Sequence, residues 1–425
     1  MNAADVSPVR HGVQDRPLTS DAPDSYGTPG MVWNLVVKVA ARCNIDCSYC
    51  YWFRDPSVYA APKLMSERVA DQLLVRVKEQ IALYSLPEFY MVLHGGEPLL
   101  WGRANFKSFA DKCRRVADET GCPVRVGTTT NGVLIDERWL DCFQENDIGI
   151  TVSIDGPAHV HDAHRKTFSG GPTHALVERG IRLLESRNIP FGILAVCNPA
   201  FAAKEYLDYF SSIGATQFDI LLPDSNFDDP RQSIGKFYRD LFDFWLAANQ
   251  KERTVRIRSV EAMLSGLIGG RSESEAFGYG SEELCTILTD GTIEPLDVLR
   301  IAGASSTRTS CNVFDNALQD IVSDPGWKAA RDASLDLCEK CRNCKYMMAC
   351  GGGYLPHRFS KEKGYDNPSV YCDDLYSIFE HLQNVVQKNI YISKPDGENL
   401  SVSDAMKISA SVTPAATEPQ LRLNR

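Results

Sequence analysis

Six short apolar runs rich in β-branched residues alternate with helical patterns over the first half of this chain. The runs lie at 32–39, 89–94, 124–129, 148–154, 191–197 and 217–222. Between them, apolar residues recur three and four positions apart, as on one face of a helix, at 64–84, 104–118, 136–146, 173–188 and 203–213. Six β-α units in succession predict a parallel sheet with right-handed crossovers. The pattern fits an open doubly wound sheet and a partial barrel equally, and in both the chemistry collects at the carboxyl ends of the strands.

Three cysteines follow the first predicted strand directly. Cys43, Cys47 and Cys50 have the spacing C-x3-C-x2-C. Three thiolates this close together can bind three irons of a 4Fe–4S cluster and leave the fourth iron open to a small molecule. A zinc site is the alternative, but zinc needs a fourth Cys or His at short spacing, and the nearest histidine after the motif is His94. We therefore predict an iron–sulfur cluster with one open coordination position.

Charge and cysteine content restrict the class of protein. The net charge is −10, which argues against a general nucleic-acid binder. Residues 1–30 lack the apolar segment of a signal peptide, and no run approaches 18 apolar residues, so we expect a cytoplasmic protein without a membrane span. In that reducing compartment, grouped cysteines bind metals more often than they form disulfides. Single cysteines within the periodic segments are expected to be small buried hydrophobes, and these are Cys113, Cys122, Cys142 and Cys197.

The composition predicts five parts. They are a disordered tail at 1–30, an α/β unit at 31–225, a helical connector at 226–284, a cysteine-rich module at 285–390 and a flexible tail at 391–425. The connector carries helical patterns at 237–248 and near 259–268, and a last helix is expected at 374–388.

Polar residues follow three of the predicted strands. The second strand ends in Gly95-Gly96-Glu97, where glycines let the backbone approach a ligand and the carboxylate can accept bonds from an ammonium group. Later strands are followed by residues that can bind polar ligands, namely Asn131, Ser153, Asp155 and Arg165. Asn-Gly and Asp-Gly pairs also make ordinary β-α turns, so these segments alone do not decide the function.

The cysteine motif with Tyr49 before its third cysteine, together with the Gly-Gly-Glu-Pro run, resembles the radical SAM enzymes. The resemblance implies a partial (β/α)6 barrel, and S-adenosylmethionine bound to the open iron and cleaved to a 5′-deoxyadenosyl radical. It also implies which residues bind this cofactor, namely Tyr49, Gly95, Gly96, Glu97, Asn131, Ser153, Asp155 and Arg165.

A dense group of cysteines near the end of the chain resembles the SPASM auxiliary-cluster domain of radical SAM peptide maturases. The resemblance assigns one auxiliary 4Fe–4S cluster to Cys341, Cys344, Cys350 and Cys372. Two further positions that often carry cysteine in this family hold Leu296 and Tyr354 here. Cys285, Cys311 and Cys338 remain for a possible second auxiliary cluster, with one non-cysteine ligand or an open iron; the alternative is that some of them bind no metal. Zinc is the alternative for this module, because C-x2-C pairs also suit zinc.

Asp297 follows the Leu296 position. In sulfatase-maturing relatives an aspartate here is a general base near the substrate, so the resemblance makes Asp297 a candidate catalytic residue. The alternative is an acid that caps a strand-end turn.

The segments 350–359 and 364–375 resemble the maturases that cross-link side chains of ribosomally made peptides into cyclophanes. The implied reaction removes a β-carbon hydrogen from the precursor peptide. Formylglycine formation in a sulfatase is one alternative, and an iron–sulfur electron carrier or scaffold without radical chemistry is the other. The expected partners are the precursor peptide and an electron donor such as flavodoxin or ferredoxin. A separate leader-binding protein, or docking on a strand edge, is expected to supply substrate recognition.

Overall fold

The computed structural model describes residues 30–250, 255–270, 272, 274–280, 284–303, 305–393, 399–401 and 420–423. Its centre is a nine-stranded sheet in the order β11-β10-β1-β3-β4-β5-β7-β8-β9. The strands are β1 (Asn34–Ala40), β3 (Phe89–Gly95), β4 (Val124–Thr130), β5 (Ile148–Ser153), β7 (Gly192–Val196), β8 (Gln217–Leu221), β9 (Arg256–Ile257), β10 (Cys285–Ile287) and β11 (Ile293–Glu294). Neighbouring strands are parallel, except that β11 runs antiparallel to β10.

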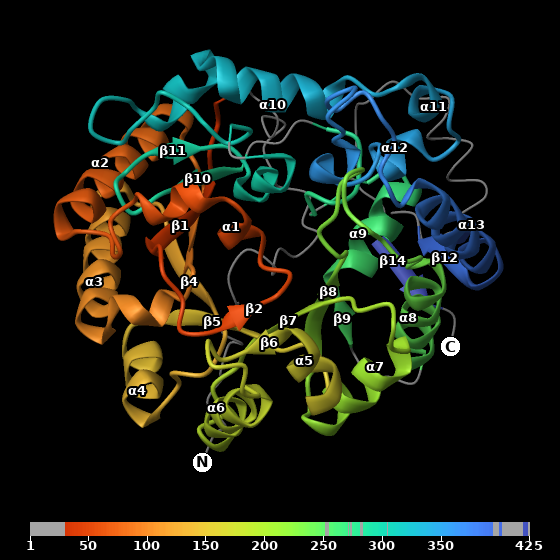
Figure 1. Cartoon of the computed structure of the whole chain (residues 1–425), viewed down its shortest axis with the longest axis horizontal. Coiled ribbons are helices and arrows are strands. Elements are labelled where there is room, and N and C mark those ends of the chain that lie inside the picture. The colour runs from red at the N-terminus through yellow and green to blue at the C-terminus, as the bar shows by residue number, and fades with distance from the viewer. Residues whose placement is uncertain are drawn as a thin grey trace.

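The strand order decides between the two predicted architectures. A doubly wound sheet reverses its strand order at a switch point, whereas β1, β3, β4, β5, β7 and β8 follow one another in chain order. The intervening helices are α2 (Glu67–Tyr84), α3 (Arg103–Thr120), α4 (Glu137–Glu145), α6 (His174–Ser186) and α7 (Ala203–Ser212). Figure 1 shows these helices in an arc around the outside of the curved sheet. The six predicted strands therefore form a partial barrel, which confirms the predicted fold class.

Helix α2 shows why the sequence folds in this way. Ser66 caps its first turn, because the Ser66 hydroxyl accepts a hydrogen bond of 3.3 Å from the backbone N–H of Val69. Its predicted apolar face, which includes Leu73 and Val77, is buried in the core that also contains Leu35 and Val37 of β1. The main core of the protein thus lies between the sheet and its outer helices.

The second half of the chain adds α8 (Gly235–Asn249), α9 (Arg258–Leu267), α10 (Pro325–Leu335), α11 (Glu339–Arg342), α12 (Met347–Cys350) and α13 (Cys372–Asn389), and the 3-10 helices η3 (Asp297–Ala302), η4 (Leu318–Ser323) and η5 (Leu355–Arg358). The helices predicted at 237–248, 259–268 and 374–388 are confirmed. The aromatic face of α8 is core, as expected, since Phe237, Tyr238 and Phe242 are buried. The hairpin of β10 and β11 extends the barrel sheet at its β1 edge.

The remaining elements are short. They are β2 (Asp46–Cys47), α1 (Tyr51–Arg54), η1 (Pro56–Tyr59), η2 (Pro98–Trp101), α5 (Ala158–His164), β6 (Arg165–Lys166), β12 (Ile390–Ser393), β13 (Asn399–Ser401) and β14 (Gln420–Leu423). The last three form a small antiparallel sheet within the segment predicted as a flexible tail. The tail predicted at 1–30 lies outside the described residues except for Gly30. Among the described helices, none has the length and apolar character needed to cross a membrane.

Candidate active site

The loop that follows β1 carries the three cysteines of the motif. The backbone N–H of Cys50 donates to the carbonyl of Cys47 at 3.0 Å, and Cys47 pairs with Arg165 in the small β2–β6 ladder. The three motif cysteines are partly exposed residues, whereas the single cysteines of the periodic segments, Cys113, Cys122, Cys142 and Cys197, are buried as predicted. Burial raises the pKa of the Cys43 thiol to about 12 and that of Cys47 to about 11. A metal centre bound here must therefore displace protons from these thiols.

The Gly-Gly-Glu turn after β3 lies against this cysteine loop. The backbone N–H of Gly96 donates to the carbonyl of Ala40, and that of Glu97 donates to the carbonyl of Arg42. A side chain on Gly96 would lie 2.3 Å from the Arg42 carbonyl oxygen, so only glycine allows this approach. The turn and the cysteine loop thus fold as one unit.

The Glu97 carboxylate is completely buried and holds the turn together. It accepts hydrogen bonds from the backbone N–H groups of Leu99 (3.0 Å) and Asn131 (2.9 Å) and from the hydroxyl of Thr130 (2.7 Å). Burial raises the pKa of Glu97 to about 7, although these three bonds favour its charged form. The Asn131 amide reaches the cysteine loop, where it donates to Asn44 at 2.7 Å and lies 3.6 Å from the Cys43 sulfur.

Replacing Gly95 with alanine should destabilise the protein strongly. Gly95 has φ +153°, and an added Cβ would lie 2.0 Å from the carbonyl oxygen of Ala40. Gly102 is the matched control, because it has φ +90° but no heavy atom within 4 Å of the added Cβ. We expect Gly102→Ala to lower the free energy of unfolding by about 1–2 kcal/mol and Gly95→Ala by a further 1–3 kcal/mol, roughly. Urea denaturation of both variants measures this, and equal losses would contradict the close packing.

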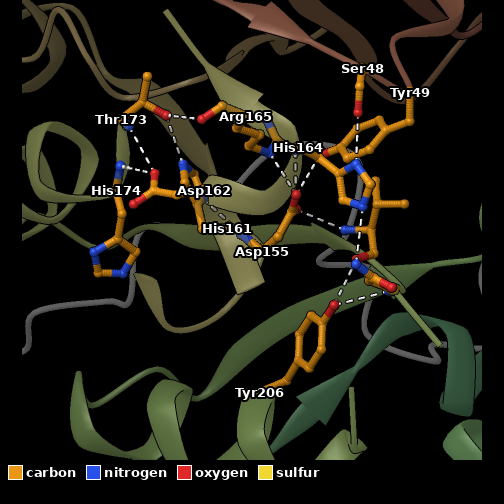
Figure 2. A network of polar contacts seen from close by, with 12 residues as sticks. Ser48, Tyr49, Asp155, His161, Asp162, His164, Arg165, Thr173, His174 and Tyr206 are labelled. Carbon is orange, nitrogen blue, oxygen red and sulfur yellow. Dashed lines mark hydrogen bonds and ion pairs between the residues drawn. The ribbon is translucent and has the colours of Figure 1, made fainter. Parts of the chain in front are cut away.

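A buried ion pair lies beside the cysteine loop, at the end of β5 (Figure 2). The Arg165 guanidinium donates to both oxygens of the Asp155 carboxylate, at 2.9 and 3.2 Å. The Tyr49 hydroxyl donates to Asp155 as well, and the backbone N–H of Val196 on β7 adds a bond of 3.0 Å. Burial alone would raise the pKa of Asp155, but the neighbouring Arg165 holds it below its usual range. Three of the predicted cofactor-binding residues therefore meet in one network, and Ser153 is buried at the end of the same strand.

Figure 2 also shows His161, which supports this ion pair through hydrogen bonds to the backbone of Asp155 and to Thr173. Its Nδ1 accepts a bond of 3.2 Å from the backbone N–H of Asp155, so the ring proton lies on Nε2, which is 3.0 Å from the Thr173 hydroxyl. That hydroxyl donates to the carbonyl of Arg165 at 2.7 Å. Burial and the positive charge of Arg165 lower the pKa of His161 to about 3. His161 is therefore neutral and connects the backbones of both partners.

His161 makes the stability of the fold depend on pH. The folded pKa is about 3, and the ordinary value is 6.5. Below pH 6.5 the unfolded chain binds a proton at His161, whereas the folded chain does not do so until the pH approaches 3. The contribution of the neutral His161 to stability is therefore complete above pH 6.5 and is lost as the pH falls towards 3. We expect a loss of about 2 kcal/mol between about pH 7 and pH 5. His161→Gln keeps an acceptor without titrating, so urea denaturation should show a smaller pH dependence for this variant; an unchanged dependence would contradict the assignment.

A second buried ion pair joins the cysteine loop to the C-terminal module. The Lys38 ammonium on β1 is fully buried and pairs with the Asp297 carboxylate at the start of η3. It also donates to the Tyr51 hydroxyl at 3.1 Å and to His94 Nδ1 at 3.2 Å. Tyr51, the residue after the third cysteine, donates to Asp297 at 2.8 Å. His94 Nδ1 accepts a further bond of 2.8 Å from the backbone N–H of Gly95, so this network reaches the Gly-Gly-Glu turn too.

The charge state of Asp297 follows from these contacts. Burial alone would raise the pKa of Asp297, but Lys38, with smaller contributions from His94 and Arg300, holds it below the usual range. Burial lowers the pKa of Lys38, and Asp297 opposes this effect. Burial and the charge of Lys38 together lower the pKa of His94 to about 3. At neutral pH the site therefore holds the Asp297 carboxylate and a neutral His94 imidazole.

The predicted auxiliary-cluster cysteines gather around α11, α12 and the start of α13. Burial raises the pKa of Cys350 to about 12, and the nearby thiols of Cys372 and Cys344 add to the rise. Cys341 interacts with Cys350 and Cys372, and with Cys338 as well. Cys285 and Cys311 belong to the main core, whereas Cys338 belongs to a small separate cluster with Cys341. The first four therefore lie near one another, with Cys338 beside Cys341.

Comparison with known proteins agrees with this geometry. The model of the radical SAM superfamily matches residues 37–208. A serine-type anaerobic sulfatase-maturating enzyme of Bacteroides thetaiotaomicron is 32% identical over 378 residues, which is 82% of this chain and 88% of the relative. The chain belongs to this family of radical SAM enzymes. A cysteine-type anaerobic sulfatase-maturating enzyme of Clostridium perfringens is 27% identical over 366 residues, 82% of this chain and 95% of the relative.

Solved structures share the fold of this chain. The structure of anSMEcpe with bound AdoMet, which is S-adenosylmethionine, has a TM-score of 0.74 at 25% identity and covers 83% of this chain and 97% of that chain. Streptococcus suis SuiB bound to precursor peptide SuiA has a TM-score of 0.58 at 15% identity, covering 80% of this chain and 76% of that chain. The chain is therefore a radical SAM enzyme of the oxidoreductase type, and its family implies a 4Fe–4S cluster and S-adenosylmethionine.

Several residues that build the candidate site were not predicted from the sequence. Neither Lys38, which lies in the strand predicted at 32–39, nor Tyr51 is among the predicted site residues. A lysine in the middle of an otherwise apolar run is itself a signal, because a fully buried ammonium needs a partner. His94 gave no such signal, since its role depends on Lys38 lying beside it.

Proposed function

We propose that this radical SAM enzyme removes a hydrogen atom from the β-carbon of a side chain in a peptide substrate. The observation that carries the proposal is the bond from Tyr51, next to the third motif cysteine, to Asp297. It places a charged carboxylate of the C-terminal module directly beside the loop where radical chemistry would start. An electron carrier has no need of such a carboxylate or of a cofactor pocket.

The residues present fit the expected cofactors. The thiols of Cys43, Cys47 and Cys50 would hold a 4Fe–4S cluster with one open iron. When bound there and reduced by one electron, S-adenosylmethionine supplies a 5′-deoxyadenosyl radical. The proposed contacts to this cofactor are those predicted from the sequence: Tyr49, Gly95, Gly96, Glu97, Asn131, Ser153, Asp155 and Arg165. Reduced flavodoxin or ferredoxin is the proposed electron donor.

Asp297 is the proposed general base. It is ionised at neutral pH because Lys38 faces it, and a base has to be ionised before it can accept a proton. Lys38 is a positioning residue, since it holds the carboxylate through the ion pair and through Tyr51. The proton that Asp297 takes is the one that the substrate loses after its β-carbon has become a radical.

We propose peptide cross-linking as the overall reaction, supported by the distinctive segments 350–359 and 364–375. The β-carbon loses a hydrogen atom, a bond forms to an aromatic ring, the ring loses a proton to Asp297, and one electron leaves. Accepting that electron is the chemistry that a cluster at Cys341, Cys344, Cys350 and Cys372 would supply. Formylglycine formation is the second candidate, favoured by the names of the relatives. Formylglycine formation also removes two hydrogen atoms from a serine, but it leaves a carbonyl group instead of a new carbon–carbon bond.

One experiment separates these reactions. Anaerobically reconstituted enzyme is incubated with dithionite, S-adenosylmethionine and two peptide sets, one with Ser or Cys residues and one with aromatic residues beside aliphatic ones. Cross-linking predicts loss of two hydrogen atoms, no hydrazide-reactive carbonyl, and missing fragments between the joined residues in tandem mass spectra. A hydrazide-reactive product supports formylglycine formation instead. If no 5′-deoxyadenosine forms with any peptide, the carrier alternative holds and the proposal fails.

A further inference from the structure

We propose that this chain carries a single auxiliary iron–sulfur cluster, bound by Cys341, Cys344, Cys350 and Cys372, and that Cys285, Cys311 and Cys338 do not form a second one. This reverses the expectation from the sequence that these three thiols share a cluster. Only the positions of these thiols in the fold decide whether they can share a cluster. These positions do not depend on which reaction the enzyme performs on its substrate.

Cys285 faces away from the site. It lies on β10 opposite Leu35 of β1, and both residues belong to the main hydrophobic core. Successive side chains of a strand point to opposite faces, so Thr286 points to the other face, where it pairs with Glu294. The Glu294 carboxylate lies near Asp297, which places the active site on that other face. A thiolate at Cys285 therefore projects into the outer core and not towards a cluster beside the site.

Cys311 and Cys338 lie at opposite ends of α10. Cys311 follows Ser310, whose N–H and hydroxyl donate to Asp324, the N-cap of this helix, at 2.8 and 2.7 Å. Cys338 comes after the last residue of α10 and packs with Cys341. Eleven helical residues span about 16 Å, which is too far for two ligands of one iron–sulfur cube. Figure 1 shows α10 crossing from the side of β10 and β11 to that of α11 and α12.

Apolar side chains occupy the positions that carry cysteine in many relatives. Leu296 and Tyr354, far apart in the chain, belong to one hydrophobic cluster with Leu299 and Leu355, and Tyr51 packs against it. The cluster thus fills the space between the cysteine loop and the C-terminal module. A second iron–sulfur cube at this place would have to displace buried leucine side chains, so the residues present do not fit one.

Iron analysis of the intact enzyme tests the proposal without any substrate. After anaerobic reconstitution and removal of loose iron, we expect about eight irons and eight sulfides per chain, from one radical SAM cluster and one auxiliary cluster. About twelve irons would overturn the proposal. About four would overturn it too, because then the auxiliary cluster is missing. Electron paramagnetic resonance of the reduced protein should resolve two cluster signals, only one of which changes when S-adenosylmethionine is added.

Two sets of variants locate the irons. Cys285→Ala, Cys311→Ala and Cys338→Ala, made singly and together, should leave the iron content unchanged. Cys341→Ala with Cys344→Ala should remove about four irons and leave the signal that responds to S-adenosylmethionine. Loss of about four irons in any of the first set would overturn the proposal. If the combined variant does not fold, Cys338→Ala alone decides, because a second cluster built from the remaining thiols needs Cys338.

Discussion

Cys47→Ala should abolish the reductive cleavage of S-adenosylmethionine. Cys47 lies in the middle of the motif, and its strand pairs with Arg165, the partner of Asp155. Without its thiolate only two protein ligands remain for a cluster that already has an open iron. Removing an outer partner of a metal ligand already costs about 10- to 100-fold in activity, so loss of the ligand itself should exceed about 100-fold. The measurement is 5′-deoxyadenosine formed with dithionite, separated by liquid chromatography.

A matched control separates this effect from the loss of any thiol. Cys122→Ala removes a buried cysteine of the barrel that lies outside the proposed site. It should keep both the iron content and the formation of 5′-deoxyadenosine near the wild-type values. If Cys47→Ala keeps more than about a tenth of the activity, which is a loss well below the 100-fold limit, the cysteine loop does not hold the reactive cluster.

Asp297→Asn should stop conversion of the peptide while sparing the cleavage of S-adenosylmethionine. The asparagine cannot accept the proton, and loss of a general base typically slows a reaction about 10²- to 10⁴-fold. The carboxylate is bonded to Tyr51 and Lys38, whereas the proposed cofactor contact Asp155 is bonded to Tyr49 and Arg165, so 5′-deoxyadenosine should still form without peptide. Asp208→Asn is the control, because Asp208 forms an exposed pair with Lys204. Equal losses of both products would contradict a role as base.

The partner variant tests whether Lys38 keeps Asp297 ionised. Lys38→Met leaves a buried carboxylate without its counter-ion, and breaking a buried pair in this way costs about 3–5 kcal/mol of stability. Stability should recover in the double variant Lys38→Met with Asp297→Leu, because neither charge is then left alone. Conversion of the peptide should not recover, since the base is gone. Urea denaturation and peptide turnover measure the two effects separately, and recovery of turnover would contradict the assignment.

The sequence predicted the barrel well because its information is local. Helix α2 is marked by the Ser66 cap and by the apolar spacing of Leu73 and Val77, and the structure has both features. Each of the six barrel strands is a short apolar run, so its position could be found without knowing its neighbours. The cysteine loop and the Gly-Gly-Glu turn could be placed together, because both follow parallel strands whose carboxyl ends share one edge of the sheet.

The rest of the site depends on contacts between distant segments. Lys38 and Asp297 meet only because β10 returns to the β1 edge of the barrel and carries η3 with it. The face of Cys285 depends on the register of a three-residue strand, which is too short for the alternation in Cys-Thr-Ile to fix it. Cys338 is grouped with Cys285 and Cys311 in the sequence only because these three remain after the other four cysteines of the module have been assigned. The length and direction of α10, which separate them, follow from packing.

The most direct test of the account is the fate of a deuterium label at the β-carbon of the substrate. The enzyme is incubated with dithionite, S-adenosylmethionine and a β-deuterated peptide that it modifies, and both 5′-deoxyadenosine and the peptide product are analysed by mass spectrometry. The account predicts that deuterium leaves the peptide and appears in 5′-deoxyadenosine, and that neither change occurs with Cys47→Ala. Product formed while 5′-deoxyadenosine stays free of deuterium would contradict it.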